Sequence, residues 1–167
     1  MQHMNARGMA ILKFYEQGPG GGVALHAYRD ASSVWTIGWG CTQGVSAGMC
    51  ITPLGADRML SDALASREVA LDKLVAGVPT TDDQFSAMLL LLYNIGAGNF
   101  ATSTVLRQHR ALHHADAAQA FSLFDEETIN GKRVVEKGLV KRRADEARLY
   151  LSKAARQPKP AKPFAAC

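Results

Sequence analysis

A short apolar segment near the middle of the chain constrains the fold more than any other feature. Residues 87–93 are apolar without a break, and Thr81-Asp82-Asp83-Gln84 before them is typical of a capping box that begins a helix. A helix that is apolar on every side has to be surrounded by other elements. The segment therefore predicts a helix over 85–94 at the centre of a helical lobe. It is far shorter than the roughly twenty residues of a membrane span, so we expect no stable membrane insertion.

Two further helices are predicted before the central one. Residues 6–16 carry apolar side chains at helical spacing, and Gly18-Pro19 must end this helix, which places Glu16 in its last turn. Thr52-Pro53 is typical of a helix start. The long helix that follows has an apolar stripe made of Leu60, Leu64, Leu71 and Val75. This helix is the expected link between two lobes.

The C-terminal third predicts shorter helices and then a change of character. Short helices are expected from Ser103 and from Asp116. A final helix is expected to place one apolar face against the core, made of Val140, Ala144, Ala147 and Leu151. Residues 153–167 combine prolines with basic residues, so we expect a separate basic tail that strengthens attraction to anionic surfaces.

The segment between the first two helices favours strands on both sides of Asp30-Ala31-Ser32-Ser33. In the second strand, Trp35 and Ile37 share one face with Trp39, while Thr36 points to the other. The expected fold is therefore α+β and mainly α. A small β-hairpin lobe spans about 20–50, and a larger helical lobe spans about 52–152 and includes the N-terminal helix. The chain has 167 residues and an apolar content of 47%. We expect residues 1–152 to form a single domain with its own core.

Charge and cysteine content limit the classes of partner and of site. With 19 basic and 15 acidic residues the chain should be attracted to polyanions, but no basic helix or aromatic-basic motif predicts nucleic-acid binding. The spacing of the three cysteines, Cys41, Cys50 and Cys167, is not that of a metal site. The same holds for the histidine pair His113-His114. Reduced thiols are expected, although a Cys41–Cys50 disulfide stays open for an oxidising compartment. Without a secretory h-region, synthesis is expected in the cytoplasm.

Two carboxyls and one hydroxyl flank the predicted hairpin. Glu16 ends the first helix, Asp30 ends the first strand, and Thr36 lies in the second. Cleavage of a glycosidic bond requires a protonated acid at the leaving oxygen and a carboxylate on the other side of the sugar. Glu16 and Asp30 could supply this pair, or they could be solvated surface charges.

Four stretches in this order resemble the phage-type lysozymes, or endolysins, over about residues 8–151. They are Leu25–Asp30 with Thr36–Gly40, Phe85–Phe100, Ser103–Arg107, and Gly138–Arg143 with Glu146 and Leu149-Tyr150. The resemblance implies a two-lobed lysozyme-like fold without a cofactor. It also implies hydrolysis of the β-1,4 bond between N-acetylmuramic acid and N-acetylglucosamine in bacterial peptidoglycan. The expected biology is lysis of a bacterial host from within, with a separate holin opening the inner membrane.

The resemblance also implies roles for single residues. Glu16 corresponds to the general acid, and Asp30 and Thr36 correspond to the residues that hold the attacking water, so we expect inversion at the anomeric carbon. Asn94 corresponds to a position that binds the sugar chain, although an Asn before Gly96 is also typical of a helix C-cap. Arg142 and Arg143 resemble a basic pair near the catalytic Glu. One of them would pair with Glu16 or with the wall; otherwise both are solvated helix charges.

Two departures from the family pattern stand out. The interval from Glu16 to Asp30 is longer than is usual in the family, and the excess falls in residues 18–22, which are rich in glycine. We expect this segment to bulge outward without moving the strand ends. Cys41 stands where the family commonly has His, a change expected to affect stability more than catalysis.

Three rival functions fit the sequence less well. A lytic transglycosylase cuts the same bond with a catalytic Glu and no attacking water, which would leave Asp30 and Thr36 without a role. An inactive wall-binding lysozyme-like module and a basic nucleic-acid-binding protein are the rivals outside enzymes. We expect a monomer that stays in the host cytoplasm until lysis and then acts at the periplasm and cell wall.

Overall fold

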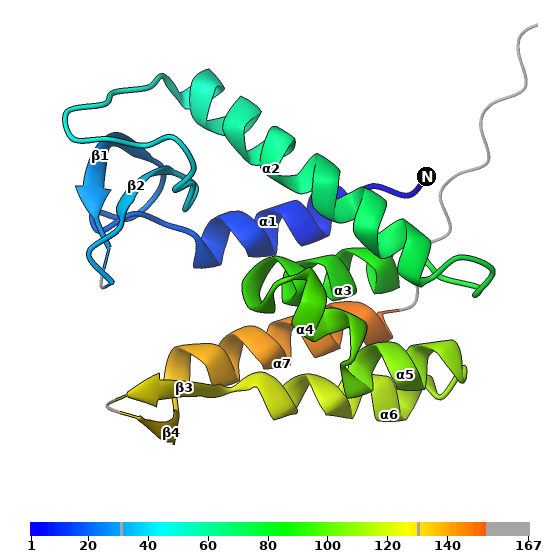
Figure 1. The fold of residues 1–167 in the computed structure, drawn as a ribbon. Coiled ribbons are helices and arrows are strands. Elements are labelled where there is room, and N and C mark those ends of the chain that lie inside the picture. Colours follow the sequence, from blue (N-terminus) through cyan, green and yellow to red (C-terminus); the bar gives the residue numbers. More distant parts are fainter. Residues whose placement is uncertain (31, 130, 153–167) are drawn as a thin grey trace, which may run out of the picture.

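The computed structural model describes residues 1–30, 32–129 and 131–152, so the basic tail expected at 153–167 lies outside the described residues (Figure 1). Its elements follow one another as α1 (Ala6–Tyr15), β1 (Ala24–Arg29), β2 (Trp35–Gly38), α2 (Pro53–Leu74), α3 (Asp82–Ile95), α4 (Ala97–Ala101), α5 (Thr104–Arg110), α6 (His114–Gln119), the 3-10 helix η1 (Ala120–Phe124), β3 (Glu126–Ile129), β4 (Lys132–Val135) and α7 (Lys137–Leu151).

The central helix is confirmed. Every residue from 83 to 92 on α3 is buried, and α3 contacts α1, α2, α4 and α7. Its start is the expected capping box: Thr81 Oγ1 accepts from the Gln84 backbone N–H at 3.1 Å, and Gln84 Oε1 accepts from the Thr81 N–H at 3.0 Å. Because these bonds satisfy two N–H groups that the helix cannot, α3 begins at a fixed place.

The long helix α2 connects the two lobes, as expected. In Figure 1 it runs from the β1–β2 hairpin across to the other helices, and it contacts β1, β2, α3 and α4. Thr52 Oγ1 caps it by accepting from the Gly55 N–H at 3.1 Å. The predicted apolar stripe is buried along its length. The α+β, mainly helical, two-lobed fold is thus confirmed.

The two hairpins differ in how well the sequence predicted them. β1 and β2 pair antiparallel, with Tyr28 opposite Thr36, as the expected hairpin around Asp30 requires. Burial along β2 does not alternate, since Thr36, Ile37 and Gly38 are all buried. The antiparallel β3–β4 hairpin was not predicted, although Asn130-Gly131 is a common two-residue hairpin turn.

The expected buried face of α7 is wrong. Val140 is 42% exposed and Leu151 is 56% exposed, whereas the buried residues of the helix include Arg142, Arg143 and Glu146. Charged side chains are rarely buried unless they are paired. Here both guanidinium groups pair with the Glu146 carboxylate. The charged face of α7 therefore packs against the core, and the aliphatic face does not.

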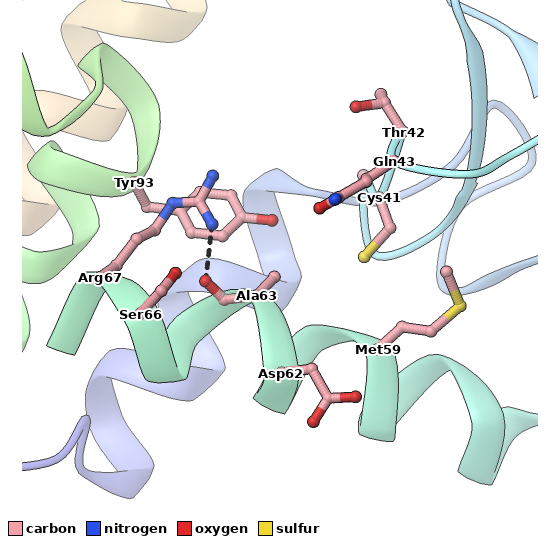
Figure 2. Close-up of a pocket in the computed structure, with 10 residues that line it drawn as sticks. Cys41, Thr42, Gln43, Met59, Asp62, Ala63, Ser66, Arg67 and Tyr93 are labelled. Carbon is pink, nitrogen blue, oxygen red and sulfur yellow. Dashed lines mark hydrogen bonds between the residues drawn. The ribbon is translucent and has the colours of Figure 1, made fainter. Parts of the chain in front are cut away.

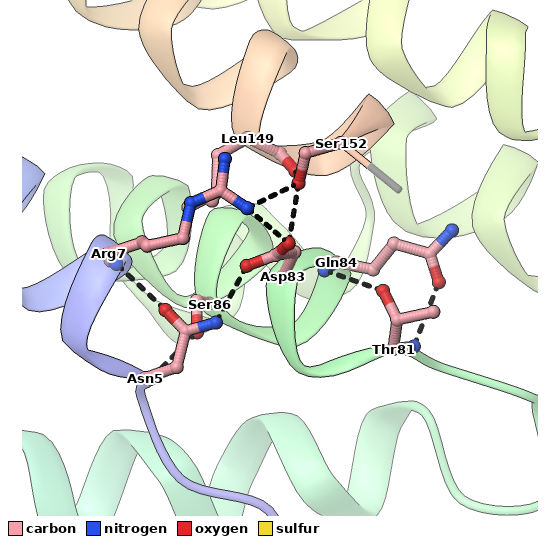
Figure 3. A network of polar contacts seen from close by, with 9 residues as sticks. Asn5, Arg7, Thr81, Asp83, Gln84, Ser86, Leu149 and Ser152 are labelled. Carbon is pink, nitrogen blue, oxygen red and sulfur yellow. Dashed lines mark hydrogen bonds and ion pairs between the residues drawn. The ribbon is translucent and has the colours of Figure 1, made fainter. Parts of the chain in front are cut away.

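The N-terminus is fastened to α3 and α7 at a buried carboxylate (Figure 3). Asp83 accepts hydrogen bonds from Asn5 Nδ2 at 2.7 Å, from Arg7 Nη1 at 2.6 Å and from Ser152 Oγ at 2.6 Å. Upstream, Glu68 of α2 accepts from the Met4 N–H at 2.9 Å. These contacts hold α1, and with it Glu16, against the helical lobe.

A buried histidine makes the stability of the helical lobe depend on pH. His109 is fully buried, with Tyr150 Oη 2.7 Å from Nδ1 and Thr80 Oγ1 2.9 Å from Nε2. Burial, and then the nearby His114, lowers the pKa of His109 to about 4. The unfolded chain takes up this proton near pH 6.5, so stability present above that pH is lost as the pH falls toward 4.

We therefore expect His109→Gln to flatten the pH dependence of unfolding. The wild type should lose up to about 3 kcal/mol from this group between pH 7 and pH 4, and the variant should not. Urea unfolding at several pH values measures the difference between the two proteins, which cancels the other titrating groups. His113→Gln, at an exposed position, is the control. Parallel curves for wild type and His109→Gln would contradict the assignment.

Candidate active site

Glu16 lies at the C-terminal end of α1, as expected from the sequence. Its backbone N–H donates to Leu12 O at 2.9 Å and closes the last turn before Gly18-Pro19 ends the helix. The side chain is 18% exposed, and Arg142 Nη1 donates to Oε1 at 2.9 Å. Of the alternatives for the basic pair, the structure therefore shows an ion pair between Arg142 and Glu16. The neighbouring Phe14 is exposed, so a guanidinium rather than this ring lies against the carboxylate.

Gly40 leaves room for the other oxygen of Glu16. A Cβ atom at this position would lie 2.8 Å from Oε2, closer than side chains tolerate. Its φ of 78° is also in the left-handed region that glycine adopts most easily. The backbone turn therefore favours glycine here, and the missing side chain leaves space for the carboxylate beside it.

Arg142 is held by a buried charge network on α7. Glu146 Oε1 accepts from Arg142 Nε at 3.2 Å and from Arg143 Nη2 at 3.0 Å. Burial raises the pKa of Glu146 to about 7, and the charges of Arg143 and Arg142 oppose this rise. Arg143 is 2% exposed, so the interpretation of both arginines as solvated helix charges is wrong. Arg143 forms no ion pair with Glu16; the carboxylate it contacts is that of Glu146.

Asp30 lies in the turn between β1 and β2. Its Oδ1 accepts from the backbone N–H groups of Ser32 and Val34, each at 2.9 Å. These bonds fix a turn in which Ser33 has a φ of 61°. Among the described residues, Oδ2 accepts no hydrogen bond. One oxygen of Asp30 thus shapes the turn and the other is free for a ligand.

Thr36 is buried in β2, with 3% of its surface exposed. Its hydroxyl donates to Val34 O at 3.1 Å, which directs the oxygen lone pairs away from that carbonyl. The hydroxyl oxygen can therefore accept a hydrogen bond from a water molecule while its own proton is engaged.

Tyr28 is a site residue that was not singled out from the sequence. It pairs with Thr36 across the hairpin. Burial raises the pKa of its phenol, and the charges of Asp30 and of Glu16 raise it further. Both carboxylates therefore act on one phenol, which stays protonated at neutral pH. Its place in the Leu25–Asp30 stretch and its aromatic character were the available signals.

Asn94 is exposed in the last turn of α3. Gly96, not Asn94, caps the helix: it has a φ of 83°, and its N–H donates to Leu92 O. The alternative of a capping role for Asn94 is therefore wrong. Sugar binding by this side chain stays a prediction.

The glycine-rich segment 18–22 is closed by hydrogen bonds within its own backbone. Gly18 N–H donates to Gly22 O at 2.9 Å, and Gly21 N–H donates to Gly18 O at 2.9 Å. The two ends of the segment lie close together, as an outward bulge requires.

Cys41 and Cys50 are both free thiols, and Cys50 Sγ lies 3.0 Å from His26 Nδ1.

A pocket of about 320 Å³ lies between the lobes (Figure 2). Gly40 is part of its wall, and a Cβ atom on Gly40 would lie 2.8 Å from Oε2 of Glu16, so the carboxylate is close to this end of the pocket. Its lining comes from the segment after β2, from α2 and from α3: Gly40, Cys41, Thr42, Gln43, Met59, Asp62, Ala63, Ser66, Arg67 and Tyr93. We call it the interlobe pocket.

The described residues contain neither a metal-binding cluster nor a membrane-spanning helix. Within residues 1–30, 32–129 and 131–152, no cluster of three or more His, Cys, Asp or Glu side chains is placed to bind a metal ion. In the same ranges, none of the helices combines the length and the apolar character that a bilayer crossing needs.

Comparison with known proteins gives one consistent result. Over 150 residues the chain is 33% identical to the endolysin of Acyrthosiphon pisum secondary endosymbiont phage 1, covering 90% of this chain and 99% of the relative. The endolysin from Escherichia coli O157:H7 phage FAHEc1 superposes with a TM-score of 0.83 at 32% identity, covering 95% of this chain and 98% of the other. The muramidase domain of SpmX from Asticaccaulis excentricus superposes with a TM-score of 0.82 at 30% identity, covering 92% and 100%.

The family model described as phage lysozyme matches residues 20–146. This range contains Asp30, Thr36, Asn94 and both arginines, and it begins just after Glu16. Glu16 is placed by the end of α1 and by its ion pair with Arg142. By the extent of these matches, the chain belongs to the phage lysozyme family.

Proposed function

We propose that the protein hydrolyses the β-1,4 bond between N-acetylmuramic acid and N-acetylglucosamine in bacterial peptidoglycan. The observation that supports this most directly is the arrangement of Glu16 and Asp30. One carboxylate ends α1 and pairs with Arg142 through Oε1, and the other lies in the β1–β2 turn, which it shapes through Oδ1. This is the pair of carboxyl groups that glycoside hydrolysis requires.

In the proposed mechanism Glu16 donates its proton to the glycosidic oxygen as the bond to the anomeric carbon breaks. Arg142 fixes Oε1, which leaves Oε2 beside Gly40 as the donor. The free oxygen of Asp30 takes a proton from a water molecule that the Thr36 hydroxyl also binds. The water oxygen attacks the anomeric carbon from the face opposite the leaving group, so the configuration inverts.

The stereochemistry of the first product tests this mechanism. We expect inversion, seen by NMR within the first turnovers on a soluble oligomer that the enzyme cleaves. Retention would instead point to a covalent intermediate on Asp30. Anhydro-muramyl ends detected by mass spectrometry would point to a lytic transglycosylase. Either of these results would exclude the water-holding role of Asp30 and Thr36.

The proposed biological role is lysis of a bacterial host. Peptidoglycan is then the macromolecular partner, and the protein, as a monomer, would reach the wall from the cytoplasm when a holin opens the inner membrane. The net positive charge of the chain suits attraction to anionic wall polymers. Expression with and without a holin, followed by culture turbidity, tests this route.

A further inference from the structure

The interlobe pocket has no part in the mechanism above, yet Gly40 in its wall lies close to the Glu16 carboxylate. Its volume is at the small end of the roughly 300–1,000 Å³ that ligand pockets occupy. A glycan strand that crosses Glu16 must pass beside it. The pocket is therefore placed to receive a group carried by the strand close to the bond to be cut.

One cation is held rigidly in this pocket. The Arg67 guanidinium lies over the Tyr93 ring, with 4.7 Å between its carbon and the ring centroid, and Nη1 donates to Ala63 O at 2.6 Å (Figure 2). Burial, and then the charge of Glu16, raises the pKa of Tyr93 to about 12, so the phenol does not neutralise the guanidinium. Stacking and the carbonyl bond fix Arg67 before any ligand arrives.

The pocket lacks an internal partner for this cation. Asp62 is the other charged residue in its wall, but this side chain is exposed and its carboxylate is turned away from Arg67 (Figure 2). Among the described residues, Arg67 forms no ion pair. The nearby Thr42, Gln43 and Ser66 are polar and neutral. Most of the guanidinium N–H groups thus remain available to an anionic ligand.

We propose that Arg67 is a specificity-determining residue that binds a carboxylate carried by the muramic acid side chain of the substrate. The planar fork of N–H groups in arginine matches a carboxylate better than any other side chain does. In intact peptidoglycan these carboxylates belong to the stem peptides. In strands stripped of peptide, the lactyl group supplies one. The inference rests on the proposed function, since it requires peptidoglycan as substrate.

The test compares two proteins on two substrates, so that one substitution in the enzyme is combined with one chemical change in the wall. Wild type and Arg67→Gln are compared on native walls and on walls whose carboxylates have been converted to amides with carbodiimide and ammonia. We expect Arg67→Gln to lower kcat/KM on native walls by about tenfold or more, mainly through KM. Amidation should cost the wild type a similar factor and should cost Arg67→Gln little, because both changes remove the same contact.

Two variants separate the contact from general charge and from packing. Arg58→Gln removes one exposed positive charge from the same helix and should respond to amidation as the wild type does. Arg67→Lys keeps the charge without the planar fork and should recover only part of the activity on native walls. Strands stripped of peptide by an amidase locate the carboxylate: a wild-type advantage there assigns the lactyl group, and an advantage only on peptide-bearing walls assigns the stem peptide.

Two outcomes would overturn the inference. Equal losses by Arg67→Gln on native and amidated walls would show a structural role for the stacked arginine, and no loss on either would show that the pocket is not used. Both outcomes leave hydrolysis by the wild type intact. Failure of the proposed function is recognised separately, because the wild type would then cut none of these substrates.

Discussion

Replacing Glu16 with glutamine is expected to lower wall hydrolysis by about 10³-fold or more while the protein stays folded. General acid catalysis contributes roughly 10²–10⁴ to a rate, and an amide has no proton of suitable acidity to give to the leaving oxygen. The amide carbonyl can still accept from Arg142 Nη1, so the end of α1 should keep its position. Clearing of purified cell walls measures the rate, and thermal unfolding checks the fold.

Glu127→Gln, on the exposed surface of β3, is the matched control and should clear walls at the wild-type rate.

Asp30→Asn tests the second carboxylate. Its carbonyl oxygen can still accept from Ser32 and Val34, so the turn survives while the charge is lost. We expect Asp30→Asn to cost orders of magnitude as well. Activity near wild type in Asp30→Asn, with Glu16→Gln inactive, would favour transglycosylase chemistry; comparable clearing by folded Glu16→Gln would remove Glu16 from the mechanism.

The sequence predicted those helices and turns that interactions between neighbouring residues determine. The capping box before α3, its uniformly apolar interior and the stripe of α2 each determine an element from neighbouring residues alone. Glu16 was placed correctly for the same reason, because Gly18-Pro19 ends α1 directly after it. The hairpin around Asp30 follows from turn residues between two β-prone stretches.

The face of α7 could not be predicted in this way. Hydrophobic periodicity selected the aliphatic side, since isolated charges avoid the interior. The buried side contains Arg142, Arg143 and Glu146, whose burial depends on their pairing and on Glu16, which is distant in sequence. The same limit applies to Tyr28 and to Arg67, whose roles depend on partners from other elements.

The second large effect is expected from Glu146→Gln, which should destabilise the fold by about 3 kcal/mol. Glu146 is fully buried and is the shared partner of Arg142 and Arg143. The amide keeps the size of the side chain but removes its charge, which leaves Arg143 as a buried cation without a carboxylate. Urea unfolding at pH 9, above the raised pKa of Glu146, measures the loss, with Glu127→Gln as the exposed control.

A double variant separates pairing from packing in this network. Arg143→Met combined with Glu146→Leu removes one buried cation together with the buried carboxylate, while Arg142 keeps Glu16 as its partner. Buried ion pairs are often replaced by apolar residues without loss of stability. We expect the double variant to unfold within about 1 kcal/mol of wild type, well above Glu146→Gln. Its wall hydrolysis should still fall, because Arg142 loses the carboxylate that orients it toward Glu16. Equal stability of Glu146→Gln and wild type would instead mean that α7 is held by its apolar contacts, and that the charges serve Glu16 alone.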